Sequence, residues 1–226
     1  MSASLAAQLP LSGQILVVYQ MCAVATHTPS IHSSFDRTRR LIFNTQDIDV
    51  VVSEEEGWEE FDSEDIKEII VRADARYYLE RSKKREATHR ILYCRLPGWA
   101  TDDTRRVKVD ILVPPVLNLP AINGYETTYF NNIPAMPIFD LLVMKTQGWW
   151  DHSNSNRADF RAKKSADVSD IFALLETAKQ EDVWYSDEAD EDRHTWEFMS
   201  HALTLAKRFV HVYGRCGQWR SIGFAV

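Results

Sequence analysis

The sequence predicts a mixed α/β fold of the α+β type: a small mixed sheet flanked by helices, followed by a helical C-terminal part. In the first half of the chain, apolar and polar residues alternate with the period of a strand. In the second half, apolar residues recur three and four positions apart, as on one face of a helix. With 226 residues, of which 45% are hydrophobic, the chain can build one sizeable core. We therefore expect an α/β core over 1–136 and a helical part over 137–226, packed together as one globular unit.

Charge and cysteine content narrow the class of protein. The 26 Lys and Arg against 33 Asp and Glu give a net charge of −7, so the chain as a whole does not attract nucleic acid. A local basic patch is compatible with this total. The three cysteines, Cys22, Cys94 and Cys216, form no C-x-x-C pair, which is typical of a reducing compartment. We expect a cytoplasmic protein.

The first apolar segment, 14–25, is too short and too interrupted to span a bilayer. No Lys or Arg precedes Arg37, although a signal peptide begins with positive charge. We expect this segment to form a core strand or helix, with no membrane association. The following residues, 26–38, are rich in Ser, Thr and His and are expected to form a loop.

The next elements are two strands and a helix that carry carboxylates. Residues 46–52 alternate so that Asp47 and Asp49 share one face of a strand, opposite an apolar face. A helix should begin near Asp62 or Ser63 and extend to about Tyr77.

Strands are then expected over 88–95 and 105–113, as an antiparallel pair joined by the turn-rich segment 96–103. In the second of them, Asp110 points away from the valine face.

The second half should contain three helices. The first begins around Pro137 and includes Lys145, and the second extends from about Ser165 to Lys179. Between them, 149–156 is expected to be a polar loop after two tryptophans. After an acidic run, the last helix covers Trp196 to Tyr213.

Asp47, Asp49 and Asp110 together predict a metal site. Two aspartates at i and i+2 on a strand project the same way, and a third from an adjacent strand would complete a carboxylate pocket. Mg²⁺ prefers such hard oxygen ligands and keeps open positions for phosphates. Two ions in one pocket can stabilise the attacking and leaving oxygens of a displacement at phosphorus. The alternative is a solvated face of an edge strand.

Four segments carry a family resemblance: Thr45–Asp49 (T-x-D-I-D), Lys108–Leu112 (a third-aspartate strand), Leu141–Lys145 (L-L-x-M-K), and Arg161–Leu175 with its two aspartates. In this order, over 44–176, they resemble the nucleotidyltransferase superfamily, in particular the AbiEii-like minimal nucleotidyltransferases.

The resemblance implies a role for each matching residue. Asp47, Asp49 and Asp110 would hold Mg²⁺ or Mn²⁺, and Asp110 would also act as general base toward the acceptor hydroxyl. Lys145 would meet the phosphates of an NTP, and Asp167 would act beside it. The basic residues Lys163 and Lys164, next to Arg161, would receive triphosphate or an acceptor backbone.

Each of these residues also has a purely structural interpretation. Lys145 would then be the polar edge of an amphipathic helix, and Lys163 and Lys164 the solvated start of the next one. Asp167 would be an acidic residue favoured near a helix N-terminus.

The chain departs from the family pattern in one place. A Gly-Gly or Gly-Ser loop that binds the terminal phosphates is absent upstream of the T-x-D-I-D segment, where the chain has residues 28–35. Ser33 and Ser34 are the candidate phosphate donors there, although their Cβ atoms hinder close approach of the backbone. Either nucleotide is bound differently, or catalysis has been lost, or the N-terminal segment is an atypical replacement for the loop.

Other enzyme classes find less support. The seven histidines form no H-E-x-x-H, and no G-x-S-x-G is present. A metal-dependent nuclease ranks third.

The sequence therefore predicts a nucleotidyltransferase that moves a nucleoside monophosphate from an NTP to a hydroxyl on a protein, an RNA or a small molecule. The alternative is a catalytically inactive binding or interaction protein built on the same fold.

Overall fold

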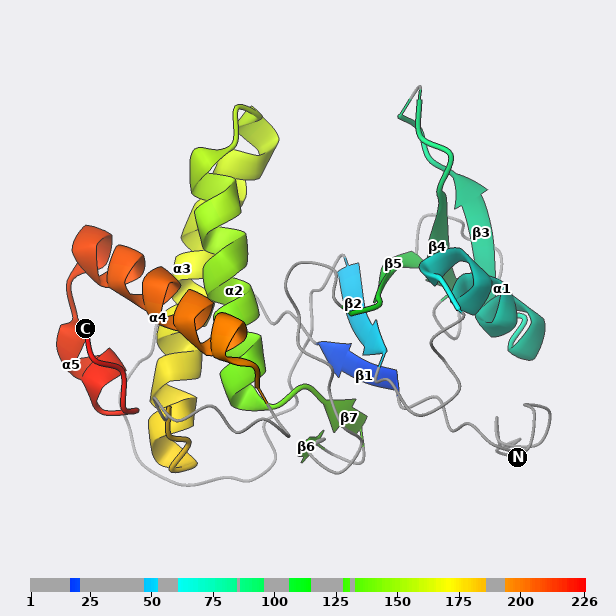
Figure 1. Ribbon diagram of the computed structural model, residues 1–226. Coiled ribbons are helices and arrows are strands. Elements are labelled where there is room, and N and C mark those ends of the chain that lie inside the picture. Colours follow the sequence, from blue (N-terminus) through cyan, green and yellow to red (C-terminus); the bar gives the residue numbers. More distant parts are fainter. Residues whose placement is uncertain are drawn as a thin grey trace, which may run out of the picture.

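A five-stranded sheet and a group of helices make up the described part of the chain (Figure 1). The computed structural model describes residues 17–20, 47–52, 61–84, 86–95, 106–114, 128–130, 133–185 and 194–226. The strand order in the sheet is β1-β2-β5-β4-β3. The strands are β1 (Val17–Gln20), β2 (Asp47–Val52), β3 (Tyr77–Arg81), β4 (Arg90–Arg95) and β5 (Arg106–Leu112).

The sheet is mixed because one pair of neighbours is parallel. β2 and β5 run parallel, whereas β1 pairs with β2, β4 with β5, and β3 with β4 in antiparallel fashion. A separate two-stranded ribbon is formed by β6 (Thr128–Phe130) and β7 (Ile133–Ala135). The mixed α+β class and the antiparallel β4–β5 pair expected from the sequence are thus confirmed.

Helix α1 (Ser63–Ala73) packs on one face of the sheet, which we call the α1 face. Ile66 of α1 is buried there against apolar side chains that alternate along the strands, and this alternation is why the strands form a half-buried sheet. The buried strand residues of this cluster are Val50, Val52, Leu92, Val109 and Ile111.

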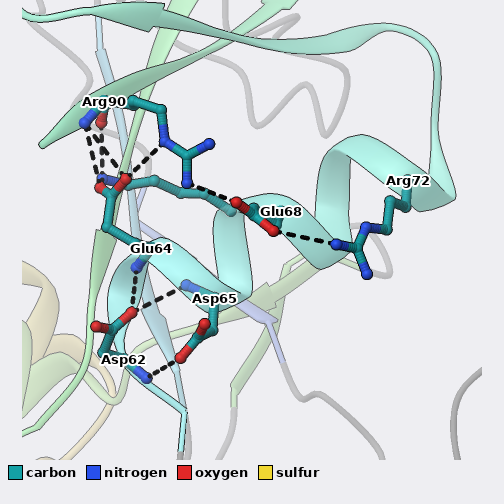
Figure 2. Close-up of polar contacts among 7 residues, drawn as sticks. Asp62, Glu64, Asp65, Glu68, Arg72 and Arg90 are labelled. Carbon is teal, nitrogen blue, oxygen red and sulfur yellow. Dashed lines mark hydrogen bonds and ion pairs between the residues drawn. The ribbon is translucent and has the colours of Figure 1, made fainter.

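Local hydrogen bonds fix the start of α1 and its position on the sheet (Figure 2). Asp62 is the N-cap, and its carboxylate accepts from the backbone N–H groups of Glu64 and Asp65 at 2.8 and 2.9 Å. Asp65 in turn accepts from the Asp62 backbone N–H, completing a capping box. Glu64 in the first turn and Glu68 one turn further along bind the guanidinium of Arg90 on β4 at 3.0 and 2.8 Å. These ion pairs set the position of α1 along β4.

The C-terminal half contains α2 (Ile138–Asn154), α3 (Ala158–Gln180), α4 (Trp196–Tyr213) and the short α5 (Cys216–Arg220). Their apolar faces form a second core centred on aromatic rings. Trp149 is 1% exposed and meets Phe209 edge to face at 5.0 Å between ring centroids, and Trp219 packs on Phe209 at 5.8 Å. None of the helices in the described part of the chain is long and apolar enough to cross a membrane.

A small third cluster joins the two parts. Val51 of β2 is completely buried with Met136, and Leu112, Leu141 and Met144 pack around them. Val51 points away from the α1 face, so the first turns of α2 cover part of the opposite face of the sheet.

Three element boundaries expected from the sequence are wrong. Residues 149–156 are not a polar loop: α2 continues to Asn154, since Trp149 is buried in the helical core, and α3 already begins at Ala158. The helix expected to reach Tyr77 ends at Ala73, and Tyr77 starts β3. By contrast, the helix start expected around Pro137 is confirmed, since Pro137 is the N-cap of α2 and Ile138 its first residue. The expected loop 26–38, the turn 96–103 and most of the acidic run lie outside the described residues.

Candidate functional site

Asp49 and Asp110 lie side by side on the face of the sheet opposite α1. The parallel pairing of β2 with β5 puts their Cα atoms in register, and neighbouring strands lie about 4.8 Å apart. Both point away from the α1 face because the apolar neighbours Ile48, Val50, Val109 and Ile111 pack toward α1. The sequence predicted this common face. Asp47 is in register with Lys108, two residues before Asp49 and Asp110 on the same two strands. The structure does not describe the side chain of Asp47.

Lys108 places a positive charge within this group of carboxylates. Its ammonium group forms an ion pair with the Asp110 carboxylate two residues along β5, on the same face of the strand. The two side chains are 34% and 39% exposed, so water and solutes reach the pair. Sequence reasoning named Lys108 but gave it no role, although a lysine at i−2 from a strand aspartate necessarily shares its face.

The donor types of this site suit a divalent cation. Carboxylate oxygens are the hard ligands that Mg²⁺ and Mn²⁺ prefer, and Asp49 and Asp110 supply them from adjacent strands. Among residues with described side chains, no group of three or more Asp, Glu, His or Cys is placed to hold a metal. The side chain of the third predicted ligand, Asp47, is not among those that the structure describes. A metal site here therefore depends on Asp47 joining the other two.

Lys145 is held by an aspartate of the neighbouring helix. Its ammonium lies 3.0 Å from the Asp170 carboxylate of α3, and the two side chains are only 14% and 16% exposed. Lys145 directly follows Met144, whose side chain packs at the junction with the sheet. The residue predicted to meet phosphates is therefore on the part of α2 that lies next to the sheet.

Asp167 has a different partner from the one expected. The structure places Asp170, rather than Asp167, at Lys145, and the Asp167 carboxylate lies 2.6 Å from Nδ1 of His152. Asp167 is 8% exposed, so the histidine supplies the hydrogen bond that a buried carboxylate needs. Sequence reasoning missed His152. The signal was a pairing across the helical hairpin: Lys145 and His152, two turns apart on α2, face Asp170 and Asp167, one turn apart on α3.

Lys163 and Lys164 lie in the first turns of α3, beside the end of α2 that is farthest from its contact with the sheet (Figure 1). Their ammonium groups lie near the rings of Phe160 and Tyr213, at 5.9 and 6.0 Å from the centroids. The structure does not bring them to Asp170, which is two turns further along α3. Ser33 and Ser34 lie outside the described residues.

Comparisons of this chain with protein-family models, with curated proteins and with solved structures found no match.

Proposed function

We propose that the protein is a metal-dependent nucleotidyltransferase, which transfers a nucleoside monophosphate from an NTP to a hydroxyl group of an acceptor. The observation that carries this proposal is the register pairing of Asp49 with Asp110 on parallel strands, on one face of the sheet. Water-accessible carboxylates at this spacing repel one another. A cation-binding role explains why the chain keeps both on the same face of the sheet.

Each of the three aspartates would have a role in the transfer reaction. Asp49 and Asp110, with Asp47, would hold Mg²⁺ or Mn²⁺, which when bound would neutralise the phosphates of the NTP. Asp110 would accept the proton of the acceptor hydroxyl, whose oxygen then forms a bond to the α-phosphorus. The bond from the α-phosphorus to the bridging oxygen breaks, and pyrophosphate leaves.

Lys145 would contact the phosphates of the NTP, and Asp170 would position it. The ion pair at 3.0 Å fixes the direction of a long side chain that otherwise has many rotamers. Because Asp170 and Lys145 are both largely buried, this orientation is maintained before substrate binds. Lys145 would have to turn part of its hydrogen-bonding capacity toward phosphate, and its three N–H donors allow this.

The second candidate is a nucleotidyltransferase-fold protein that binds a ligand without catalysis. The pairing of Lys108 with Asp110 favours it, since an internal ammonium already neutralises a predicted metal ligand. The lack of a glycine-rich phosphate loop in the sequence supports the same alternative.

A labelling experiment separates the two candidates. Purified protein is incubated with each α-labelled NTP, Mg²⁺ or Mn²⁺, and cell extract, alongside Asp49→Asn, Asp110→Asn and the control Asp159→Asn. Asp159 is an exposed carboxylate on α3 that pairs with Arg157, so its change tests charge loss alone. The enzyme transfers label in the wild type and the control, and both site variants lose about 100-fold or more.

The opposite result is equally clear. If the wild type transfers no label, and NTP with Mg²⁺ leaves its melting temperature unchanged, the enzyme proposal is wrong. An NTP-dependent rise in melting temperature without transfer identifies the inactive binding protein.

A further inference from the structure

The β3–β4 hairpin concentrates positive charge in a chain whose net charge is −7. Residues 81–90 read R-S-K-K-R-E-A-T-H-R, with five Lys or Arg and one acidic residue, Glu86. Arg81, Lys83 and Lys84 are exposed, and within the described part of the chain they form no ion pair. Figure 1 shows this hairpin projecting beyond the ends of the neighbouring strands. The charges of Arg81, Lys83 and Lys84 are therefore presented to solvent.

Beside the hairpin, on the face opposite α1, the guanidinium groups of two arginines lie over the rings of two tyrosines, a group that we call the Tyr–Arg layer. Tyr78 of β3 and Tyr93 of β4 are cross-strand partners whose rings stack at 5.8 Å. The guanidinium carbon of Arg95 lies 4.1 Å above Tyr78, and that of Arg106 lies 4.0 Å above Tyr93. Arg106 also donates to the Tyr78 hydroxyl at 3.0 Å and pairs with Glu80, so its plane is fixed.

The Tyr–Arg layer is continuous with the carboxylates. Tyr93 is in register with Lys108, and Lys108 is in register with Asp47. Tyr78, Tyr93 and Lys108 therefore form one row across three neighbouring strands, which spans about 10 Å at the usual strand spacing. Asp110 lies in the next row, on the same face.

This combination fits a particular ligand chemistry. An arginine stacked on a tyrosine presents its outer planar face to a base, while its charge attracts phosphate. Stacking surfaces next to exposed lysines are how proteins bind single-stranded nucleic acid without reading its sequence. The positive charge alone could also attract an anionic membrane. However, the hairpin tip, Ser82 to His89, has no large apolar side chain that could insert into a bilayer.

We infer that the β3–β4 hairpin and the Tyr–Arg layer bind single-stranded nucleic acid, the lysines contacting its backbone and the arginines stacking on its bases. A single-stranded nucleic acid bound there would have one end near Asp110. That end would supply the acceptor hydroxyl, a step that rests on the proposed function. The binding itself does not depend on it.

The experiment measures fluorescence anisotropy of a fluorescein-labelled 12-nucleotide RNA and of its DNA counterpart, without NTP or divalent cation, from 50 to 200 mM salt. For the wild type we expect binding that weakens as salt rises, because counterions are released from the phosphates. Lys83→Gln/Lys84→Gln should reduce the slope of log affinity against log salt by about 1.4, at about 0.7 per phosphate contact.

The matched control is Lys179→Gln/Lys207→Gln, which removes the same charge from exposed positions on α3 and α4. It should leave the slope unchanged. Equal losses in the two double variants would mean that binding follows total charge, and would overturn the inference.

Arg95→Lys tests stacking apart from charge. Lysine keeps the charge but has no plane, so affinity should fall about fivefold or more while the salt slope stays the same. The circular dichroism spectrum and melting temperature report whether the variant folds. An Arg95→Lys variant that folds and binds as the wild type would exclude the stacking role.

Absence of oligonucleotide binding at 50 mM salt would also overturn the inference, as would binding to phosphatidylserine vesicles alone. Because NTP and metal are absent, a failure of this assay is separate from a failure of nucleotidyl transfer. If the protein binds no oligonucleotide but transfers label to a small molecule, the proposed function is supported and this inference is wrong.

Discussion

Lys145 of α2 and Asp170 of α3 form an ion pair at 3.0 Å with 14% and 16% of their side chains exposed. Removing one partner leaves a charge that little water can reach. We therefore expect Asp170→Asn to lower the free energy of unfolding by about 1–3 kcal/mol in urea denaturation. The double variant Lys145→Met/Asp170→Leu should be close to the wild type, since an apolar pair of similar volume can replace a buried ion pair.

The same double variant separates stability from nucleotide binding. If Lys145 contacts phosphate, the folded double variant loses the NTP-dependent rise in melting temperature that the wild type shows. A double variant that still responds to NTP would restrict Lys145 to a structural role.

Lys108 should weaken metal binding at the carboxylates, because its ammonium pairs with Asp110 and repels cations. We expect Lys108→Gln to raise Mn²⁺ affinity by about tenfold, measured from the electron paramagnetic resonance signal of free Mn²⁺. Lys84→Gln, which removes an exposed charge from the hairpin, is the control and should have no such effect. Unchanged Mn²⁺ binding in Lys108→Gln would show that Asp110 is not a ligand.

The ion pairs between α1 and β4 should make stability depend on pH. Partial burial raises the pKa of Glu64, but hydrogen bonds from Lys67 and Arg90 outweigh it, so the pKa lies below its ordinary value of 4.5. The pKa of Glu68 is lowered as well, by its hydrogen bond from Arg90. A lowered carboxylate pKa stabilises the fold above 4.5, and this contribution is lost as pH falls through the lowered pKa.

Arg90→Gln should therefore be less stable than the wild type at neutral pH, with a difference that shrinks in acid. Urea denaturation between pH 3 and pH 7 measures it. Arg72→Gln, which contacts Glu68 from a 78% exposed position, should show a much smaller difference. A difference for Arg90→Gln that stays constant with pH would place its effect in packing rather than in charge.

Strand β5, which carries Asp110, could be predicted because its apolar and polar residues alternate without interruption. In β5, Val107, Val109 and Ile111 are buried while the residues between them are partly exposed. β3 shows no such contrast: four of its five residues are intermediate in exposure, since both faces are half covered. Sequence periodicity therefore indicates a strand only where one face is buried and the other is open.

Helix length was misjudged at Trp149 because polar residues follow it in the sequence. The ring is buried against Phe209 of α4, and this tertiary contact keeps the segment helical to Asn154. No local pattern encodes a partner that lies sixty residues further along the chain.

The sequence predicts which face of the sheet carries the site residues, but not which residues pair with one another. The alternation of apolar and polar residues predicts that Asp49 and Asp110 lie on the same face if β2 and β5 are neighbouring strands. The parallel register that puts them side by side is a property of the whole sheet. In the same way, the choice of Asp170 over Asp167 as partner of Lys145 depends on how α2 and α3 are aligned. Both relationships need the tertiary structure.

Gly223 and Gly148 should respond to alanine in opposite directions. Gly223 has φ +95°, and a Cβ there would lie 2.4 Å from the backbone oxygen of Tyr185, which cannot move aside because its ring stacks on Phe224. Gly223→Ala should lower the free energy of unfolding by about 2–4 kcal/mol. Gly148 lies within α2 with nothing within 4 Å of an added Cβ, so Gly148→Ala should stabilise by about 0.5–1 kcal/mol. Urea denaturation compares both with the wild type, and a neutral Gly223→Ala would mean that the C-terminal turn rearranges without loss of packing.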